Sequence, residues 1–349
     1  MLPEIERITF PLPDDFEFDE IIDVRTPDEF AEDHVSGAIN LPVLSNEERV
    51  IVGTQYKNES RFDAAKSGAA LIYKNLANHL SVHFSGKPKD YRPLVYCWRG
   101  GQRSESLATV LRAISWNVAM LDRGYKSYRT HVISYTEQRS SELSFRIINS
   151  LTGCGKTRLL HALRDQGAQV LDLEGLANHK GSVFGGDPEN PQPAQKRFET
   201  LIYDQLATFD AEKTVFVEAE SSKIGRLNLP VSLWIKMRES PVTKLESTLP
   251  ARTEFLRTDY EDWLKNIDRI TLTIDRLKSF HSRETILQWK TWAANDEWRA
   301  LIAALLENHY DRNYNPGGSG HYNIPDATHV LPDQSDAAFE QCAADLIAT

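Results

Sequence analysis

The sequence predicts an α/β protein built from two parallel sheets, one in each half of the chain. In both halves short apolar segments alternate with amphipathic helical segments, the pattern of parallel strands joined by crossover helices. Two of the apolar segments run directly into glycine-bearing loops, at 97–104 and 150–157. The length of 349 residues suits two domains. The polar stretch 136–144 predicts a boundary between domains 1–139 and 140–349.

Predicted strands of the first half lie at 20–25, 93–97 and 117–122, and the segment 34–42 is predicted to be a turn with Gly37 that leads into another short strand. Thr26, Pro27 and Glu29 follow the first strand as N-cap, first helical residue and capping-box partner, which predicts a helix there. Apolar residues at helical spacing predict two more helices, over 61–80 and 104–114.

Predicted strands of the second half lie at 145–149, 168–174, 214–220 and 231–237. A helix is expected over 158–167 and ends at Gly167. The last hundred residues read as helical. Their expected core consists of large apolar side chains: Trp289, Trp292, Trp298, Leu301, Ile302, Leu305 and Leu306.

The composition excludes several classes of protein. Hydrophobic residues make up 41% and charged residues 26%, as in a folded globular protein rather than a disordered or collagen-like one. No apolar run reaches the ~18 residues that span a bilayer, and the N-terminal segment is acidic where a signal peptide would be basic. We therefore expect a cytoplasmic protein with no membrane partner. Its three cysteines are too scattered for a disulfide framework or a zinc site.

The net charge of −10 is unevenly distributed. Residues 1–50 hold 14 acidic residues against three arginines. The stretch 87–139 instead carries ten Lys and Arg against four acidic residues, with aromatic residues interleaved. A polyanionic partner such as RNA is therefore compatible with this stretch, although an ordinary solvated face has the same composition.

Residues 97–104, CWRGGQRS, lie between a predicted strand and a predicted helix. In such a loop successive backbone N–H groups and the helix N-terminus stabilise an anion. Cys97 is therefore a candidate nucleophile, Arg99 and Arg103 are candidate oxyanion binders, and Gly100 and Gly101 form the amide cradle.

Residues 150–157, SLTGCGKT, form a second candidate anion site. They match the P-loop pattern except that Ser150 replaces its first glycine. Gly153 and Gly155 let the backbone approach a phosphate, Lys156 supplies a charge, and the Thr157 hydroxyl suits Mg²⁺. At the end of the strand 214–220, the carboxylates of Glu218 and Glu220 are placed to reach that metal.

Two further loops follow strands at the same expected sheet edge. Their polar and basic residues are candidate contacts to a second phosphate or to RNA: His179, Lys180, Ser182, Ser221, Lys223 and Arg226. A solvated loop is an equally good interpretation of any one of them.

The segments 23–42 and 96–104 resemble a rhodanese domain, in which a loop cysteine carries a transferable chalcogen. Together with LDRGYKSYR (121–129), SLTGCGKT, HKGSVFG (179–185) and EAESSKIG (218–225), in that order, the chain resembles the tRNA 2-selenouridine synthases over about residues 12 to 317. The resemblance implies an N-terminal rhodanese-like parallel sheet flanked by helices and a C-terminal P-loop α/β domain with a helical C-terminal part.

The same resemblance implies a transferase that modifies the wobble uridine in the anticodon loop of tRNA. It implies S-geranylation of 2-thiouridine by geranyl diphosphate, then selenation from selenophosphate. Cys97 would handle selenium, and the P-loop would hold the diphosphate through Mg²⁺. Lys126 and Arg129 would contact the RNA.

Alternatives from other classes stay open at this point. Five residues separate Cys97 from Arg103, one more than in the usual sulfurtransferase loop and the spacing of cysteine phosphatases. A P-loop kinase or NTPase is a second alternative, and Ser150 argues mildly against it. A non-catalytic tRNA-binding module would not need Cys97.

Overall fold

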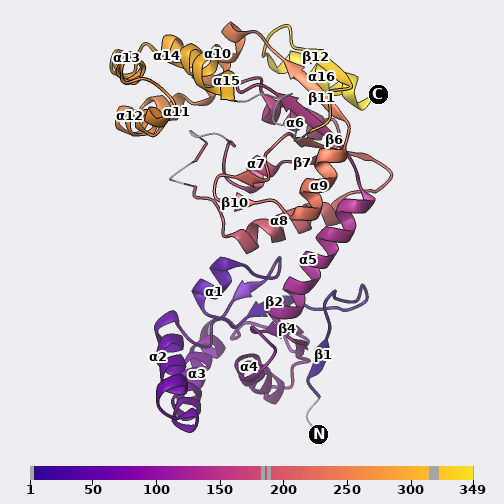
Figure 1. Ribbon diagram of the computed structural model, residues 1–349. Coiled ribbons are helices and arrows are strands. Elements are labelled where there is room, and N and C mark those ends of the chain that lie inside the picture. The colour runs from indigo at the N-terminus through magenta and orange to yellow at the C-terminus, as the bar shows by residue number, and fades with distance from the viewer. Residues whose placement is uncertain (1–3, 182–184, 187–189, 314–321, 349) are drawn as a thin grey trace. The chain divides into compact units, whose positions relative to one another are not determined.

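The computed structural model describes residues 4–181, 185–186, 190–313 and 322–348. The chain divides into two compact units, Met1–Tyr135 with Pro193–Asp204, and Thr136–Gln192 with Gln205–Thr349. Each unit contains one five-stranded sheet, and every strand pairing in both sheets is parallel. The predicted α/β fold class is therefore confirmed (Figure 1).

The sheet of the first unit has the order β1-β5-β4-β2-β3. Its strands are β1 (Glu6–Ile8), β5 (Ala119–Leu121), β4 (Pro93–Tyr96), β2 (Glu20–Asp23) and β3 (Ile39–Asn40). Its helices are α1 (Pro27–Glu32), α2 (Asn46–Asn58), α3 (Arg61–Val82), α4 (Gln102–Ala113) and α5 (Tyr125–Glu142). Helix α1 begins with the predicted capping box, in which Thr26 and Glu29 bond each other's backbone N–H. Strand β1 and helix α2 are not among the elements predicted from the sequence.

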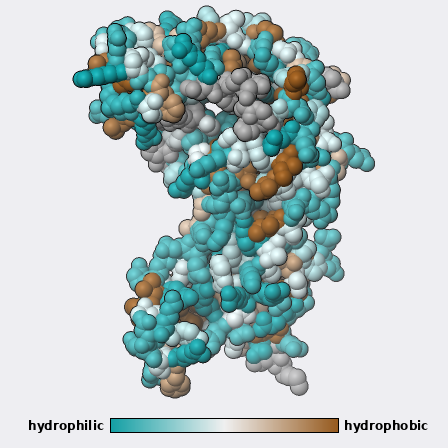
Figure 2. Space-filling model, viewed as in Figure 1, coloured by the Kyte–Doolittle hydropathy of each residue, from teal (hydrophilic) through white to brown (hydrophobic). Residues whose placement is uncertain are grey.

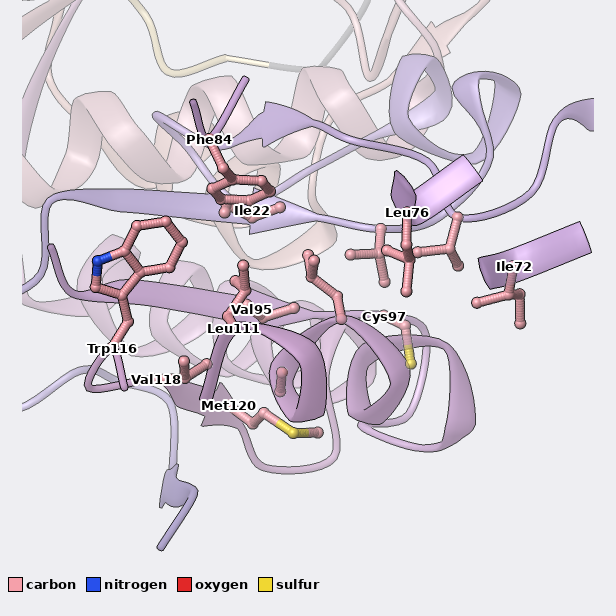
Figure 3. Close-up of a cluster of buried hydrophobic side chains, with 14 of the residues drawn as sticks. Ile22, Ile72, Leu76, Phe84, Val95, Cys97, Leu111, Trp116, Val118 and Met120 are labelled. Carbon is pink, nitrogen blue, oxygen red and sulfur yellow. The ribbon is translucent and has the colours of Figure 1, made fainter. Parts of the chain in front are cut away.

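Apolar side chains cover both faces of this sheet, as a parallel sheet with helices on each side requires. Ile22, Val95 and Met120 belong to the cluster that faces α3 and α4 (Figure 3). Their chain neighbours, such as Ile21 and Leu94, join a second cluster with residues of α5. The alternation follows the two-residue period of a strand.

The sheet of the second unit has the order β12-β11-β6-β8-β7. Its strands are β12 (Ala327–Val330), β11 (Val242–Glu246), β6 (Ser144–Ser150), β8 (Thr214–Glu218) and β7 (Gln169–Leu171), and a small antiparallel ribbon joins β9 (Lys223–Ile224) to β10 (Leu227–Asn228). Helix α6 (Lys156–Asp165) follows β6 and packs against α16 (Asp336–Ile347). Helix α7 (Leu173–Leu176) follows β7, and α9 (Val231–Glu239) packs against β6. Helix α8 (Gln195–Thr208) is divided between the two units, with its larger part in the first.

A group of helices extends from this sheet, consistent with the predicted helical C-terminal part (Figure 1). It comprises α10 (Leu249–Asp259), α11 (Glu261–Leu264), α12 (Ile267–Asp275), the 3₁₀ turn Arg276–Ser279, α13 (Arg283–Ala294), α14 (Trp298–Leu305), the π-helix Leu306–Tyr310 and α15 (Asp311–Asn313). Trp289, Leu301 and Leu305 are buried in its core, as predicted, and Trp292 and Trp298 pack against that core.

The predicted strand at 231–237 is wrong, because this segment forms helix α9. Pro230 starts the helix, and Leu233 and Met237, four residues apart, are its buried residues. A short apolar run fits a buried strand or one face of a helix equally well. The fourth major strand is β11, which begins five residues after this run.

The division between the units differs from the predicted boundary in two ways. The polar stretch after residue 135 continues helix α5 to Glu142, with Thr136 and Ser140 buried. Residues 193–204, within the predicted second domain, are grouped with the first unit. Contacts distant in sequence cause this grouping, since Thr200 bonds Asp33 and Asp204 bonds Ser36.

Hydrophilic residues dominate the visible surface, and hydrophobic ones form separate patches (Figure 2). Within the described residues, no helix combines the length and the apolar character that crossing a membrane requires.

Candidate active sites: a cysteine loop and a phosphate-type loop

The cysteine loop leaves the central strand of the first sheet. Cys97 directly follows β4, and Gly101 is the N-cap residue of α4, with no side-chain cap. The first-turn N–H groups of α4 therefore lack a capping side chain, which suits an incoming anion. Gly100 has φ +65°, and a Cβ there would lie 3.0 Å from the Leu121 carbonyl oxygen. Only glycine fits this turn without strain.

The sulfur of Cys97 lies at the edge of the core cluster, and the residue is only 4% exposed (Figure 3). The Ser104 hydroxyl lies 3.2 Å from Sγ and 3.0 Å from the Gly101 carbonyl oxygen, so its single proton can be donated to either atom. A hydroxyl donor stabilises a sulfur that carries negative charge. Ser104 was not among the predicted site residues, although its position on the first turn of the predicted helix was a usable signal.

The two loop arginines have different environments. Arg99 is exposed. Arg103 bonds Glu29 through both terminal nitrogens, at 2.6 and 3.2 Å. Burial tends to raise the pKa of Glu29, but the Arg103 bonds outweigh it and hold that pKa below its usual value. Arg103 is therefore a fixed cation beside the loop, and its role in binding an oxyanion stays a prediction.

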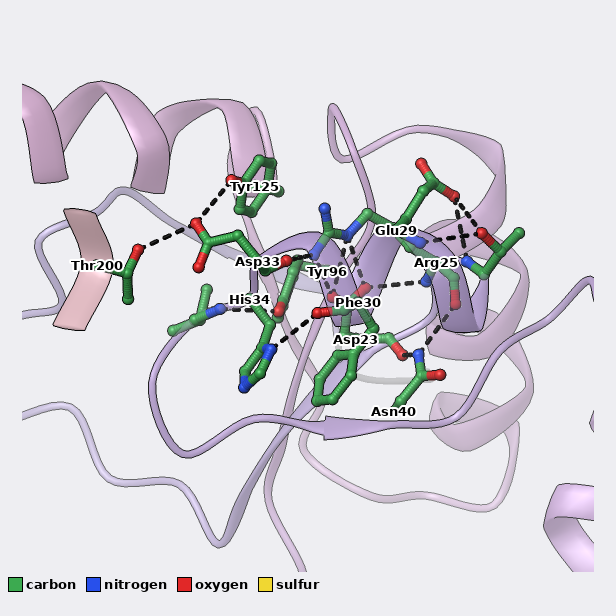
Figure 4. Close-up of polar contacts among 12 residues, drawn as sticks. Asp23, Arg25, Glu29, Phe30, Asp33, His34, Asn40, Tyr96, Tyr125 and Thr200 are labelled. Carbon is green, nitrogen blue, oxygen red and sulfur yellow. Dashed lines mark hydrogen bonds and ion pairs between the residues drawn. The ribbon is translucent and has the colours of Figure 1, made fainter. Parts of the chain in front are cut away.

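A buried polar network fixes the backbone next to the cysteine (Figure 4). The Tyr125 N–H donates to the Cys97 carbonyl at 2.8 Å, and the Tyr125 hydroxyl donates to Asp33 at 2.7 Å. Thr200 also donates to Asp33, at 3.0 Å. Burial raises the pKa of Asp33 despite these bonds. Tyr125 and Tyr128 are each 1% exposed, so both are core aromatics rather than open stacking surfaces.

The two basic residues of α5 that were predicted to contact RNA also have different environments. Arg129 forms an ion pair with Glu199 and donates to the Lys196 carbonyl at 3.3 Å. Lys126 is exposed. Of the two predicted RNA contacts, Lys126 is therefore accessible to a phosphate, whereas Arg129 holds residues of α8.

The phosphate-type loop leaves β6, the central strand of the second sheet. Gly153 and Gly155 have φ +83° and +79°, and Gly155 is the N-cap of α6. A Cβ on Gly155 would collide with the Phe339 ring, and one on Gly153 would lie 3.0 Å from Leu256. These close contacts explain both glycines. Ligands of open parallel sheets bind where strand order reverses, which is the position of this loop.

Thr157 contacts one of a group of neighbouring acidic side chains, which are Asp172, Glu174, Glu218 and Glu220. The Thr157 hydroxyl donates to Glu174 at 3.3 Å, and the Glu174 N–H donates to Glu218 at 2.7 Å. Glu218 is buried, and its Oε2 has no hydrogen-bond partner. Burial, with Asp172 and Glu174 nearby, raises its pKa well above the usual range. Glu174 was missed, although it follows the strand 169–171 at the same sheet edge as the loop.

Glu220 also holds its proton near neutral pH. Burial raises its pKa to about 8, opposed by the charge of Lys156 and assisted by Glu174. This pKa lies above the ordinary value of 4.5 for a glutamate. Protonated Glu220 therefore contributes fully to the stability of the fold below pH 4.5, and this contribution is lost as the pH rises through about 8.

We therefore predict that Glu220→Gln reduces the loss of stability between about pH 5 and pH 8. The measurement is the thermal unfolding midpoint of both proteins across this range. Glu239→Gln, at an exposed position at the end of α9, is the matched control and should follow the wild-type curve. Parallel curves for Glu220→Gln and the wild type would contradict the prediction.

A cavity of about 1200 Å³ opens over this loop. Its lining includes several of the predicted site residues: Gly153, Gly155, Lys156, Thr157, His179, Lys180 and Glu220. Lys180 pairs with Asp259 at 2.6 Å, and burial lowers the pKa of His179. Among the described residues, no three His, Cys, Asp or Glu side chains are arranged to hold a metal ion by themselves.

Four other described residues that were predicted for this site lie outside the cavity lining: Glu218, Ser221, Lys223 and Arg226. Ser221 precedes β9 and bonds Lys223, the first residue of that strand, and Arg226 lies in the turn before β10 and donates to the Gln192 carbonyl at 2.5 Å. Ser182 lies outside the described residues.

Fold and sites define a protein with a rhodanese-type domain followed by a P-loop-type domain. Two family models match in this order, the Rhodanese-like domain over residues 12–131 and the tRNA 2-selenouridine synthase AAA domain over residues 143–282. The tRNA 2-selenouridine synthase of Nitrosomonas europaea is 33% identical, over 82% of this chain and 75% of its own length. The one of Hydrogenovibrio crunogenus is 33% identical, over 84% and 88%. The chain belongs to the tRNA 2-selenouridine synthase family.

Proposed function

We propose that this protein is a transferase that converts 2-thiouridine at the wobble position of tRNA into 2-selenouridine. The observation that carries the proposal is the combination, in one chain of this family, of a nucleophilic cysteine loop with a separate phosphate-type loop. Each loop leaves the central strand of its own sheet. Two anion sites suit a reaction with two phosphorus-containing co-substrates, which we take to be geranyl diphosphate and selenophosphate.

The first step is assigned to the phosphate-type loop. The thiouridine sulfur attacks the first carbon of the geranyl chain, the carbon–oxygen bond breaks, and diphosphate leaves with the electron pair. Lys156 and the amides of the loop stabilise the charge on that leaving group. Mg²⁺ in such sites binds substrate phosphates, water and one or two protein oxygens. Thr157 and the neighbouring Glu174 carry oxygens of this kind.

The second step is assigned to the cysteine loop. Alkylation makes the sulfur at C2 a good leaving group, so a selenium nucleophile can form the carbon–selenium bond as the geranylthiolate departs. The uncapped N-terminus of α4 suits the phosphoryl oxygens of selenophosphate. The Cys97 thiolate, which lies within hydrogen-bond distance of the Ser104 hydroxyl, attacks the phosphorus of selenophosphate, and the phosphorus–selenium bond breaks. Hydrogen selenide leaves as the selenium nucleophile for C2, and water then releases phosphate from the cysteine.

The test is mass spectrometry of wobble nucleosides after incubation of 2-thiouridine tRNA with the protein. Geranyl diphosphate and Mg²⁺ alone should yield the S-geranyl nucleoside, and later addition of selenophosphate should convert it to 2-selenouridine. Selenophosphate alone should leave 2-thiouridine unchanged. Absence of any modified nucleoside with all components present would refute the proposal.

Lys126 is proposed as a tRNA phosphate contact because it is an exposed lysine of α5 within the basic stretch 87–139. We predict that Lys126→Ala weakens tRNA binding and reduces the slope of log affinity against log salt by about 1. Filter binding at several salt concentrations measures both. Lys74→Ala, at an exposed position of α3, is the control and should match the wild type. An unchanged slope for Lys126→Ala would exclude the contact.

A further inference from the structure

Arg252 is a buried cation directly behind the phosphate-type loop. It lies on α10 and is 3% exposed. Its Nε donates to the Thr152 carbonyl at 2.8 Å, and its two terminal nitrogens donate to the Asp311 carboxylate at 3.0 and 2.6 Å. A buried guanidinium is tolerated only when its charge and donors are satisfied. Asp311 supplies the opposite charge, and the Nε donor is directed at the loop.

The bond to Thr152 determines how the loop presents its backbone. In a trans peptide the carbonyl and the next N–H point in opposite directions, so fixing the Thr152 carbonyl also fixes the Gly153 N–H. Gln334 holds the following carbonyl, since its Nε2 donates to Gly153 O at 2.8 Å. Loops that bind phosphate do so with their N–H groups, and carbonyls directed at the ligand would repel it.

We propose that Arg252 is a positioning residue of the phosphate-type loop. Its Nε holds the Thr152 carbonyl directed away from the ligand, and the Gln334 side chain holds the Gly153 carbonyl in the same way. The inference rests on the proposed function of the loop and adds residues that lie outside the loop motif. Asp311 fixes the orientation of the Arg252 guanidinium through their ion pair. It directly follows the π-helix Leu306–Tyr310, whose His309 and Tyr310 line the same cavity as the loop.

The experiment measures binding of inorganic pyrophosphate with Mg²⁺ to the full chain by calorimetry. Arg252→Lys keeps the charge but lacks the planar guanidinium that spans the Thr152 carbonyl and both Asp311 oxygens, so we expect its Kd to rise about 10- to 100-fold. Gln334→Ala removes one neutral bond and should raise the Kd about 3- to 10-fold. Arg257→Lys is the matched control, because Arg257 lies on the same helix in a surface pair with Glu254, and its Kd should equal that of the wild type.

A second readout separates positioning from a loss of folding. In the geranylation assay, Arg252→Lys should raise the KM for geranyl diphosphate by a factor similar to that of the Kd, at a temperature where circular dichroism shows the variant folded. An unchanged Kd in folded Arg252→Lys overturns the inference while leaving the proposed function intact. If that variant does not fold, an unchanged Kd in Gln334→Ala overturns it. Failure of the wild type to bind pyrophosphate overturns both this inference and the assigned role of the loop.

Discussion

Replacement of Cys97 by alanine is expected to abolish selenium incorporation while geranylation of the tRNA continues. The variant loses the only sulfur in the cysteine loop, and removal of a catalytic nucleophile costs at least about 10³-fold in rate. The phosphate-type loop belongs to the other compact unit, so its alkylation step should not depend on this sulfur. Mass spectrometry of wobble nucleosides should therefore show S-geranyl-2-thiouridine accumulating without 2-selenouridine.

Cys342→Ala is the matched control for this experiment. Cys342 is a buried free cysteine on α16, so its replacement by alanine removes a thiol outside the cysteine loop. The control should produce 2-selenouridine at the wild-type rate. Selenation at an undiminished rate in Cys97→Ala would show that selenium reaches the tRNA without this cysteine, and the second step would have to be reassigned.

Replacement of Lys156 by alanine is expected to abolish geranylation, by about 10²- to 10³-fold, because the charge that stabilises the departing diphosphate is lost. Lys156 is the first residue of α6 and lines the cavity over the loop. Its charge also opposes the raised pKa of Glu220, so the variant should hold the Glu220 proton to higher pH. The measurement is the initial rate of S-geranyl nucleoside formation with saturating tRNA.

The control for Lys156→Ala is Lys213→Ala, which removes an exposed lysine of the same unit. It should leave both steps unchanged. Pre-geranylated tRNA supplied to Lys156→Ala should still be converted to 2-selenouridine. If this second step fails as well, the two steps are not divided between the loops as proposed.

Local sequence signals predicted the elements that carry both loops. The capping box at Thr26 and Glu29, the strand before Cys97 and the glycines at 153 and 155 depend on neighbours within a few residues. Such features can be predicted from the sequence because turn geometry and capping are short-range effects. The prediction of a strand at 231–237 is wrong because the same apolar residues suit a strand or a helix. Only the packing of Leu233 and Met237 in the folded chain distinguishes the helix from the strand.

The partners of the site residues were not predictable in this way. Arg103 was expected to face an anion, and its bonds to Glu29 join residues 74 positions apart in the chain. Arg252 reaches the loop across 100 positions. Residues 193–204 join the first unit through Thr200 and Asp204. Each of these contacts depends on which helix lies beside which loop.

By itself, the sequence determined the α/β class, the order of the two domains and the two glycine-bearing loops with their cysteine and basic side chains. These follow from periodicity, from turn residues and from residue chemistry, all of which act over short distances along the chain. Only the tertiary structure decided which charged side chains form ion pairs, as Arg129 does, and which are exposed to solvent, as Lys126 is. It also decided which side chains from distant parts of the sequence contact the two loops. Burial sets the energy of a charged or polar group, and burial is a property of the folded chain rather than of any one segment.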